Sequence, residues 1–160
     1  MNHASFLKEL FSSLRKKDPS LSILIDSNGA IDFEKHADLL SLSDGVMLDV
    51  KAFSPLFHQK VTGISNEMVL KNLYYLLREN KLEEVRTVIF PYFQKENEYT
   101  VKNVARIIKS NTRYKLLKYR YFGVRDEGVR MFGKLISSRD ELLHYENIAR
   151  ENGCYSTVII

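Results

Sequence analysis

An acid and a base stand two residues apart at the end of an apolar run in the first third of the chain. Residues 44–51 read DGVMLDVK, and the apolar residues of this run predict a buried strand. Because strand side chains alternate between two faces, Met47, Asp49 and Lys51 share one face. A carboxylate beside an ammonium group can bind the charged parts of a ligand, or act toward it as a base and an acid.

Other predicted strands also place a polar or charged side chain at or toward the carboxyl end. These side chains belong to Asp26, Arg86 and Arg120. The carboxyl ends of parallel strands meet at one rim, where ligands bind in α/β proteins, so we expect these residues at the same rim as Asp49 and Lys51. The structural alternative is that charged residues at strand ends pair with one another or cap neighbouring helices.

Helical and strand-like patterns alternate along the chain, which predicts an α/β fold with a parallel sheet, either open or curled toward a barrel. The predicted strands are residues 21–25, 46–50, 84–90 and 114–122, and the tail 154–160 can add another. Helices are expected near 4–16, 33–42, 54–60, 69–77, 101–108 and 138–152, whereas residues 123–128 show no period and predict a loop. With about four to five βα units and no internal boundary, residues 1–160 are expected to form a single domain.

Composition excludes several classes of protein. The chain has 160 residues, of which 44% are hydrophobic, so it can bury a sizeable core. No apolar run approaches the roughly 20 residues of a membrane helix, and the first residues have no signal-peptide layout, so we expect a cytoplasmic protein. The single cysteine, Cys154, excludes a disulfide within the chain and a site built only from thiolates. The histidines are scattered without metal-ligand spacing, so a zinc site is not expected.

Positive charge is concentrated in one region. Residues 106–139 contain ten Lys or Arg and only two acidic residues, a local charge of +8, which leaves −4 for the rest of a chain of net charge +4. A basic region can bind a nucleic acid, a phosphate or carboxylate ligand, or an acidic protein. The sequence has no RNA-binding aromatic motif and no zinc-finger spacing, and a solvated basic face is the commoner explanation, so nucleic-acid binding is not expected.

The strand ends resemble those of a known family, the radical S-adenosylmethionine activating enzymes of the pyruvate formate-lyase activase type. The family's LDLK or LDVK strand and its TG(V/I)S(N) turn are matched by residues 48–51 and 62–66, and its D(T/S)NG segment by residues 26–29. Residues 85–91 match the family's (V/I)R-x-(V/P)-(V/I)-x-P strand. Residues 117–123 match LPYHxxG, except that Lys118 and Arg120 replace the proline and the histidine. The resemblance covers about residues 5–133 and implies a partial (β/α) barrel.

The resemblance also implies roles for individual residues. It implies that S-adenosylmethionine is the cofactor and that a monovalent cation lies beside the carboxylate of the cofactor. The implied cofactor contacts are Asn28, Asp49, Lys51, Arg86 and Arg120, and the implied cation ligands are Asp26, Ser27 and Met47.

One hallmark of the family is missing from this sequence. The family holds a 4Fe–4S cluster with CxxxCxxC, and this chain has only Cys154, so no cluster is expected in it. We interpret the chain as the carboxyl-terminal part of an activase barrel, inactive alone. The intact enzyme would reductively cleave S-adenosylmethionine and take a hydrogen atom from a glycine of its partner, a glycyl-radical enzyme.

This interpretation also predicts which proteins the chain binds. The missing amino-terminal half of the barrel would be a partner. Without it, the apolar strand 21–25 is expected to have an open edge that self-associates or is covered by the helix 4–16.

Two alternatives remain open. One is a non-catalytic α/β module that binds a partner through residues 106–139. The other is a distinct small enzyme that uses Asp49 and Lys51 as base and acid. The sequence does not decide whether the chain is itself an enzyme, and it does not name the glycyl-radical enzyme.

Overall fold

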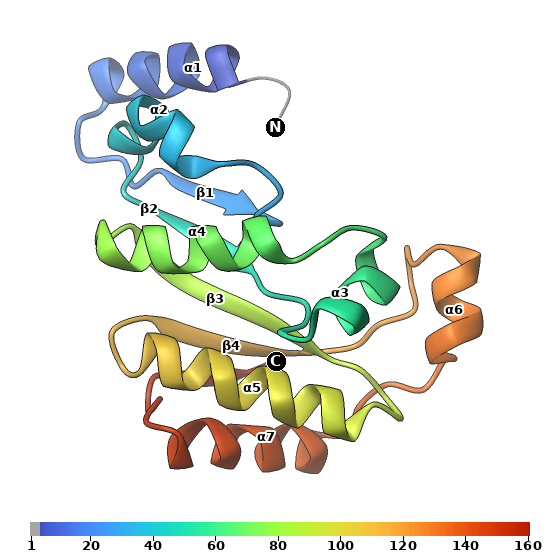
Figure 1. Cartoon of the computed structure of the whole chain (residues 1–160). Helices are drawn as coiled ribbons and strands as arrows, with labels where there is room; N and C mark the ends of the chain where they lie inside the picture. Colours follow the sequence, from blue (N-terminus) through green and yellow to red (C-terminus); the bar gives the residue numbers. More distant parts are fainter. Residues whose placement is uncertain (1–3) are drawn as a thin grey trace.

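The computed structural model describes residues 4–160, which form one five-stranded sheet with helices between the strands (Figure 1). The strands are β1 (Leu24–Ser27), β2 (Gly45–Asp49), β3 (Leu82–Ile89), β4 (Arg113–Lys118) and β5 (Thr157–Ile159). The helices are α1 (Ala4–Lys17), the short 3₁₀ helix η1 (Phe33–His36), α2 (Ala37–Ser41), α3 (Pro55–Thr62), α4 (Glu67–Arg78), α5 (Gln94–Ile108), α6 (Asp126–Phe132) and α7 (Arg139–Glu151).

The strand order is that of a barrel wall. The five strands lie in sequence order, β1-β2-β3-β4-β5, and each neighbouring pair is parallel. Right-handed connections between successive neighbours place every crossover helix on the same face of the sheet. A doubly wound sheet would instead reverse its order and carry helices on both faces. The predicted α/β fold is therefore confirmed, and the arrangement agrees with part of a (β/α) barrel.

One hydrophobic core joins the helices to a single face of the sheet. Val46, Leu48, Val85 and Leu116 of the strands are fully buried in it. Residues of α1, α2, α4, α5 and α7 belong to the same core, and α4, α5 and α7 lie together in front of the sheet in Figure 1. In α4 the buried residues Val69, Leu73 and Leu76 recur at helical spacing, which explains why this segment forms a helix against the sheet.

The bounds of the strands differ from those predicted, and the differences at the first and fourth strands have a visible cause. The first strand covers residues 24–27 rather than 21–25, because the preceding segment is held elsewhere: Arg15 donates to the Leu21 carbonyl, and the Ile23 amide donates to the Asp44 carboxylate. The fourth strand ends at Lys118 rather than at residue 122. Its neighbours β3 and β5 end at Ile89 and Ile159, so residues 119–122 have no strand to pair with in the described chain.

One helix was missed by the sequence analysis, which predicted a loop over residues 123–128. The structure has helix α6 from Asp126 to Phe132. Charged residues and Gly128 occupy most of its first turn, so the segment shows no apolar period. It is fixed by tertiary packing instead, because Phe132 is buried among aromatic side chains.

The helix starts and the terminal strand are confirmed. The Ser54 hydroxyl accepts a hydrogen bond from the Phe57 amide at the start of α3, and Pro55 is the first helical residue. Ser138 and Glu141 form a reciprocal capping box at the start of α7. The tail adds β5, and Cys154 is buried.

The edges of the sheet are β1 and β5. The first helix packs against α2 (Figure 1) and contributes Phe11 to the core. Self-association through the edge of β1 stays a prediction. Among residues 4–160, none of the helices is long and apolar enough to cross a membrane.

Candidate functional site

The face of the sheet opposite the helices carries a chain of ion pairs that crosses the strands. Arg86 of β3 contacts Asp26 of β1, with 2.8 Å between Nη1 and Oδ2. The same guanidinium donates from Nε to Oε1 of Glu84 over 2.6 Å, and Lys115 of β4 donates to Oε2 of Glu84 over 2.9 Å. Within residues 4–160, the sheet therefore has one apolar face that the helices cover and one charged face that they leave uncovered.

Glu84 is the centre of this network. Its side chain is only 2% exposed, and Arg113 also approaches it at 3.5 Å. Burial by itself raises the pKa of a carboxyl group, but the hydrogen bonds from Lys115 and Arg86 outweigh burial, so the pKa of Glu84 lies below its ordinary value. Glu84 is thus a buried carboxylate that stays charged because cations surround it.

The acid and base predicted from the sequence form an ion pair. Nζ of Lys51 lies 2.8 Å from Oδ2 of Asp49, and both side chains are partly exposed. Asp49 stands opposite Arg86 in the register of β2 and β3. The pair therefore lies between the charged face of the sheet and the rim at the carboxyl ends of the strands. A carboxylate and an ammonium group held this way can bind hydroxyl and carboxylate groups of one ligand.

The turn after β1 is built around a buried side chain of another helix. Asn72 of α4 donates to the carbonyls of Gly29 and Ile31, at 2.9 and 2.5 Å, and accepts from the Phe33 amide at 3.1 Å. Gly29 has a φ of +72°, and a Cβ atom there would lie 2.9 Å from Leu48. The glycine of the DSNG segment is therefore required by backbone conformation and by packing. Asn28 itself is exposed at the tip of the turn.

The TGISN segment fixes the chain beyond β2. Gly63 ends α3 with a φ of +85°, a conformation that glycine adopts without strain. Asn66 is buried and donates to the carbonyls of Ala52 and Phe53, at 3.3 and 2.8 Å. The segment thus holds the residues that follow Lys51, which explains why the two motifs occur together.

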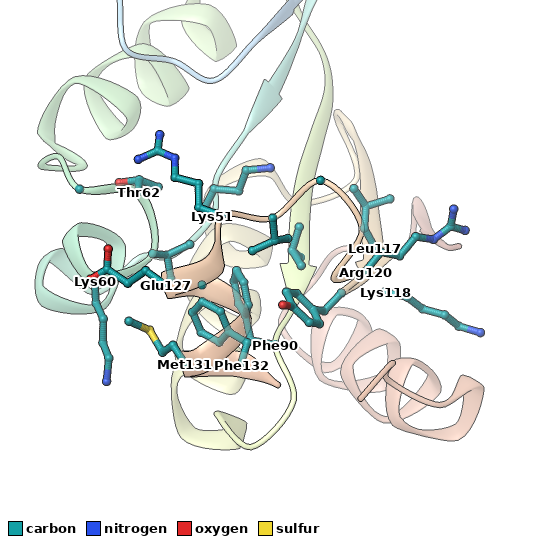
Figure 2. A pocket seen from close by; sticks show the side chains of 18 of the residues that line it. Lys51, Lys60, Thr62, Phe90, Leu117, Lys118, Arg120, Glu127, Met131 and Phe132 are labelled. Atoms are coloured by element: carbon teal, nitrogen blue, oxygen red, sulfur yellow. The ribbon is translucent and has the colours of Figure 1, made fainter. Parts of the chain in front are cut away.

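A pocket of about 920 Å³ lies at the carboxyl ends of β3 and β4, between α3 and α6. Figure 2 shows Phe90 and Phe132 deep in this pocket, with Lys51 and Lys60 on one side and Arg120 on the other. Apolar residues from the strands and from α6 form its floor: Val88, Phe90, Leu117, Tyr119, Met131 and Phe132. Cationic residues line its edge: Lys51, Lys60, Lys118, Arg120 and Arg125. Among the described residues, Glu127 is the one acidic residue that lines it. Such a pocket fits a ligand that has an apolar or aromatic part and a negative charge.

An aromatic cluster holds α6 in place beneath this pocket. The ring of Phe132 lies 4.7 Å from that of Phe90 and 5.7 Å from that of Tyr119, measured between centroids. Phe57 of α3 lies 5.7 Å from Phe90. These contacts join two helices to the ends of two strands. The sequence analysis missed the contributions of α3 and α6 to the pocket, and the density of aromatic residues near 90–93 and 119–122 was the available signal.

The residues predicted for the site fall into two groups. Lys51 and Arg120 line the pocket. Arg86 contacts Asp26 and also Met47, so these three lie together on the charged face of the sheet. Asp49 connects the two groups, because it pairs with Lys51 and stands opposite Arg86 in the sheet.

The basic region 106–139 does not form one continuous patch. Arg113 and Lys115 are engaged by Glu84, and Arg113 also by Glu83. Arg106 donates to the Asn152 side chain at 2.9 Å. The members of the region that line the pocket are Lys118, Arg120 and Arg125. The remaining cationic residues of the region are exposed: Lys109, Arg130, Lys134 and Arg139. The charge excess seen in the sequence is therefore shared among internal contacts, the pocket and the exposed surface.

Proteins with similar sequences are named as activating enzymes of pyruvate formate-lyase. No protein-family model matches the sequence. The pyruvate formate-lyase-activating enzyme of Streptococcus mutans is 30% identical over 124 residues, which are 74% of this chain and 47% of that protein. The pyruvate formate-lyase 1-activating enzyme of Escherichia coli K12 is 27% identical over 124 residues, which are 75% of this chain and 50% of that protein. This chain thus spans about half the length of these relatives.

A solved structure supports the fold. The crystal structure of a domain of a pyruvate-formate lyase-activating enzyme from Bacteroides vulgatus aligns with a TM-score of 0.76. The alignment covers 99% of this chain and 91% of that chain, at 16% identity. At this identity the likeness is evidence for a common fold.

Proposed function

We propose, because this chain is a relative of the pyruvate formate-lyase-activating enzymes, that it is the carboxyl-terminal part of a radical S-adenosylmethionine activase barrel. Residues 1–160 would form one domain of a cytoplasmic enzyme whose partner is a glycyl-radical enzyme. The observation that carries this proposal is the position of the Asp49–Lys51 pair. It lies at the rim of a sheet whose helices, in the part of the chain that the structure describes, cover one face, and it adjoins a pocket that cationic residues line.

The side chains at this rim fit the polar groups of S-adenosylmethionine. The cofactor carries a carboxylate, an amino group, ribose hydroxyls and an aromatic base. Lys51 can pair with the carboxylate, Asp49 can accept from hydroxyl or amino groups, and Arg120 can contact the base where the family has histidine. When bound in the intact enzyme, the cofactor supplies the radical that takes hydrogen from the partner's glycine. The residues of this chain bind and orient it.

The residues of this chain do not fit an iron–sulfur cluster. Cys154 is buried, and residues 4–160 contain no group of three His, Cys, Asp or Glu side chains that could hold a metal ion. We propose that the amino-terminal half of the barrel supplies the cluster ligands, either from the same gene or from a separate chain.

Weak binding of S-adenosylmethionine tests the proposal. Without the cluster, the cofactor has only the rim contacts, so calorimetry should give a dissociation constant no tighter than roughly millimolar, about −4 kcal/mol. Lys51→Ala should weaken this binding further because it removes the cation that pairs with the carboxylate. The matched control is Lys102→Ala, at an exposed lysine on α5, which should bind like the wild-type chain. Tight binding that is indifferent to Lys51 would contradict the proposed site.

A second candidate is a non-catalytic module that binds a partner protein through the pocket. It is favoured by large apolar side chains that are exposed in α3 and before α6, the two segments that flank the pocket: Leu56 is 82% and Phe122 is 73% exposed. Reversing the charge at Arg120 and Arg125 would then abolish binding of the partner, and the chain would not bind S-adenosylmethionine. Binding of S-adenosylmethionine that Lys51→Ala weakens would favour the activase.

A further inference from the structure

The backbone just before Lys51 is held by a buried hydroxyl of the neighbouring strand. Strand β2 ends at Asp49, and the carbonyl of Val50 accepts a hydrogen bond from the Thr87 hydroxyl of β3 at 2.9 Å. Thr87 is 1% exposed. Because side chains alternate along a strand and Arg86 lies on the charged face, Thr87 points to the face that the helices cover. The residue next to Lys51 is thus held from the helix side of the sheet.

Tyr114 of β4 fixes the direction of this hydrogen bond. Its hydroxyl lies 3.1 Å from Oγ1 of Thr87, and its side chain is fully buried. The Val50 carbonyl can only accept, so the single proton of the Thr87 hydroxyl goes to it, and Tyr114 must donate to Thr87. Burial raises the pKa of Tyr114 above its ordinary value, so this hydroxyl keeps the proton that it donates. Hydrogen bonds of one direction therefore run from β4 through β3 to the end of β2.

The backbone just after Lys51 is also held by buried side chains. The Phe53 amide donates to Oγ1 of Thr100 in α5 at 3.0 Å, and Thr100 is 2% exposed. The Asn66 side chain donates to the carbonyls of Ala52 and Phe53. Lys51 therefore stands between two short backbone segments, each of which is fixed by side chains from other elements.

The ion pair of Lys51 does not by itself fix the position of this lysine at the rim. Its partner Asp49 belongs to the same segment of chain, so the pair orients the Lys51 side chain relative to its own strand. A lysine side chain is a compact charge on a flexible four-carbon stem, so the place of its ammonium group depends on its backbone. A side chain that binds a ligand has to be held within about 0.5 Å of the productive geometry.

We propose that Thr87 and Tyr114 are positioning residues for Lys51, and that they act through the carbonyl of Val50. The inference rests on the proposed function only for the role of Lys51 as a ligand of the cofactor. The structural alternative is that the two hydroxyls merely satisfy each other in the core. Variants of similar stability separate these roles, and the order of Lys51 is measured without cofactor.

NMR relaxation of the Lys51 backbone amide tests this inference. Its order parameter in the wild-type chain should be about 0.85, and Thr87→Val should lower it toward about 0.6, because valine keeps the shape of threonine but cannot donate to Val50. Tyr114→Phe should lower it by less, because the Thr87 hydroxyl remains but loses the donor that orients it. Thr87→Ser keeps the hydroxyl and should keep the order of the wild-type chain, although the lost methyl group lowers stability.

Thr112→Val is the matched control. Thr112 is 4% exposed, and its hydroxyl donates to the Leu82 carbonyl at 3.2 Å, at the amino ends of β3 and β4. The change removes a buried hydrogen bond of the same kind, so it should lower stability as Thr87→Val does but leave the order of Lys51 unchanged. In a titration with roughly millimolar S-adenosylmethionine, Thr87→Val should lose the shift of the Lys51 amide signal, whereas Thr112→Val should keep it.

Three results would overturn the inference. The first is a folded Thr87→Val chain in which Lys51 is as ordered as in the wild-type chain, and the second is retention of the cofactor-induced shift by that variant. The third is equal disorder of Lys51 in Thr87→Ser and Thr87→Val, because packing rather than the hydroxyl would then hold the segment. Where Thr87→Val does not fold, wild-type order of Lys51 in Tyr114→Phe contradicts the inference. A wild-type chain that does not bind the cofactor would contradict the proposed function alone.

Discussion

Replacing Glu84 with glutamine should lower the free energy of unfolding by about 3 kcal/mol. Glutamine keeps the shape of the side chain but removes the charge that Arg86 and Lys115 face at 2.6 and 2.9 Å. Lys115 is only 19% exposed, so water compensates for little of the loss. Denaturant unfolding at neutral pH measures the effect. Glu83→Gln is the matched control: Glu83 is exposed and pairs with Arg113 at the surface, so this change should cost less than about 1 kcal/mol.

The effect of Glu84 should also depend on pH. The pKa of Glu84 is lowered in the folded protein, so its charge stabilises the fold above the unfolded value of roughly 4.3. This stabilisation is lost as the pH falls through the folded pKa. The wild-type chain and Glu84→Gln should therefore begin to converge in stability as the pH falls below the unfolded pKa, and should become equal once the pH is below the lowered pKa of the folded state. A difference that stays constant into acid would show that Glu84 does not carry its charge in the folded state.

Asn72→Ala should have a second large effect, a loss of about 3–5 kcal/mol in the free energy of unfolding. The change leaves the carbonyls of Gly29 and Ile31 and the amide of Phe33 without their buried partner. Each orphaned group costs roughly 1–3 kcal/mol. Urea unfolding monitored by circular dichroism measures the loss.

Asn103→Ala provides the control for the change in helix propensity. Asn103 lies in α5 and donates to the Tyr99 carbonyl within its own helix. Alanine favours helix more than asparagine, so this variant should be at least as stable as the wild-type chain. Equal effects of the two substitutions would mean that the turn after β1 does not depend on Asn72.

Much of the fold follows from local patterns. Val69, Leu73 and Leu76 mark one face of α4, and β-branched residues mark β3, because one side of each element must be buried. The order of the strands was not determined by these patterns, because alternation alone allows an open or a barrel-like sheet. The ends of the strands could not be predicted from local sequence either, because β4 ends where its neighbours end rather than where its own sequence changes.

The sequence predicted several residues of the site, but not the contacts between residues of different strands. The period of two placed Met47, Asp49 and Lys51 on one face. The Asp49–Lys51 ion pair agrees with that prediction. The spacing did not determine which of the charged residues at the strand ends would pair. Arg86 and Asp26 are 60 residues apart, and their contact depends on the pairing of three strands. Helix α6 escaped detection for the same reason, since distant aromatic side chains hold it.

An NMR titration tests most directly the proposal that S-adenosylmethionine binds at the rim of this sheet. Adding the cofactor to the isotope-labelled chain should shift the backbone amide signals of Asp49, Lys51 and Arg120. The signals of α5 and α7, on the opposite face of the sheet, should stay in place, and Lys51→Ala should weaken the shifts. Shifts confined to α5 and α7, or no shifts at roughly ten times a millimolar dissociation constant, would contradict binding at this rim.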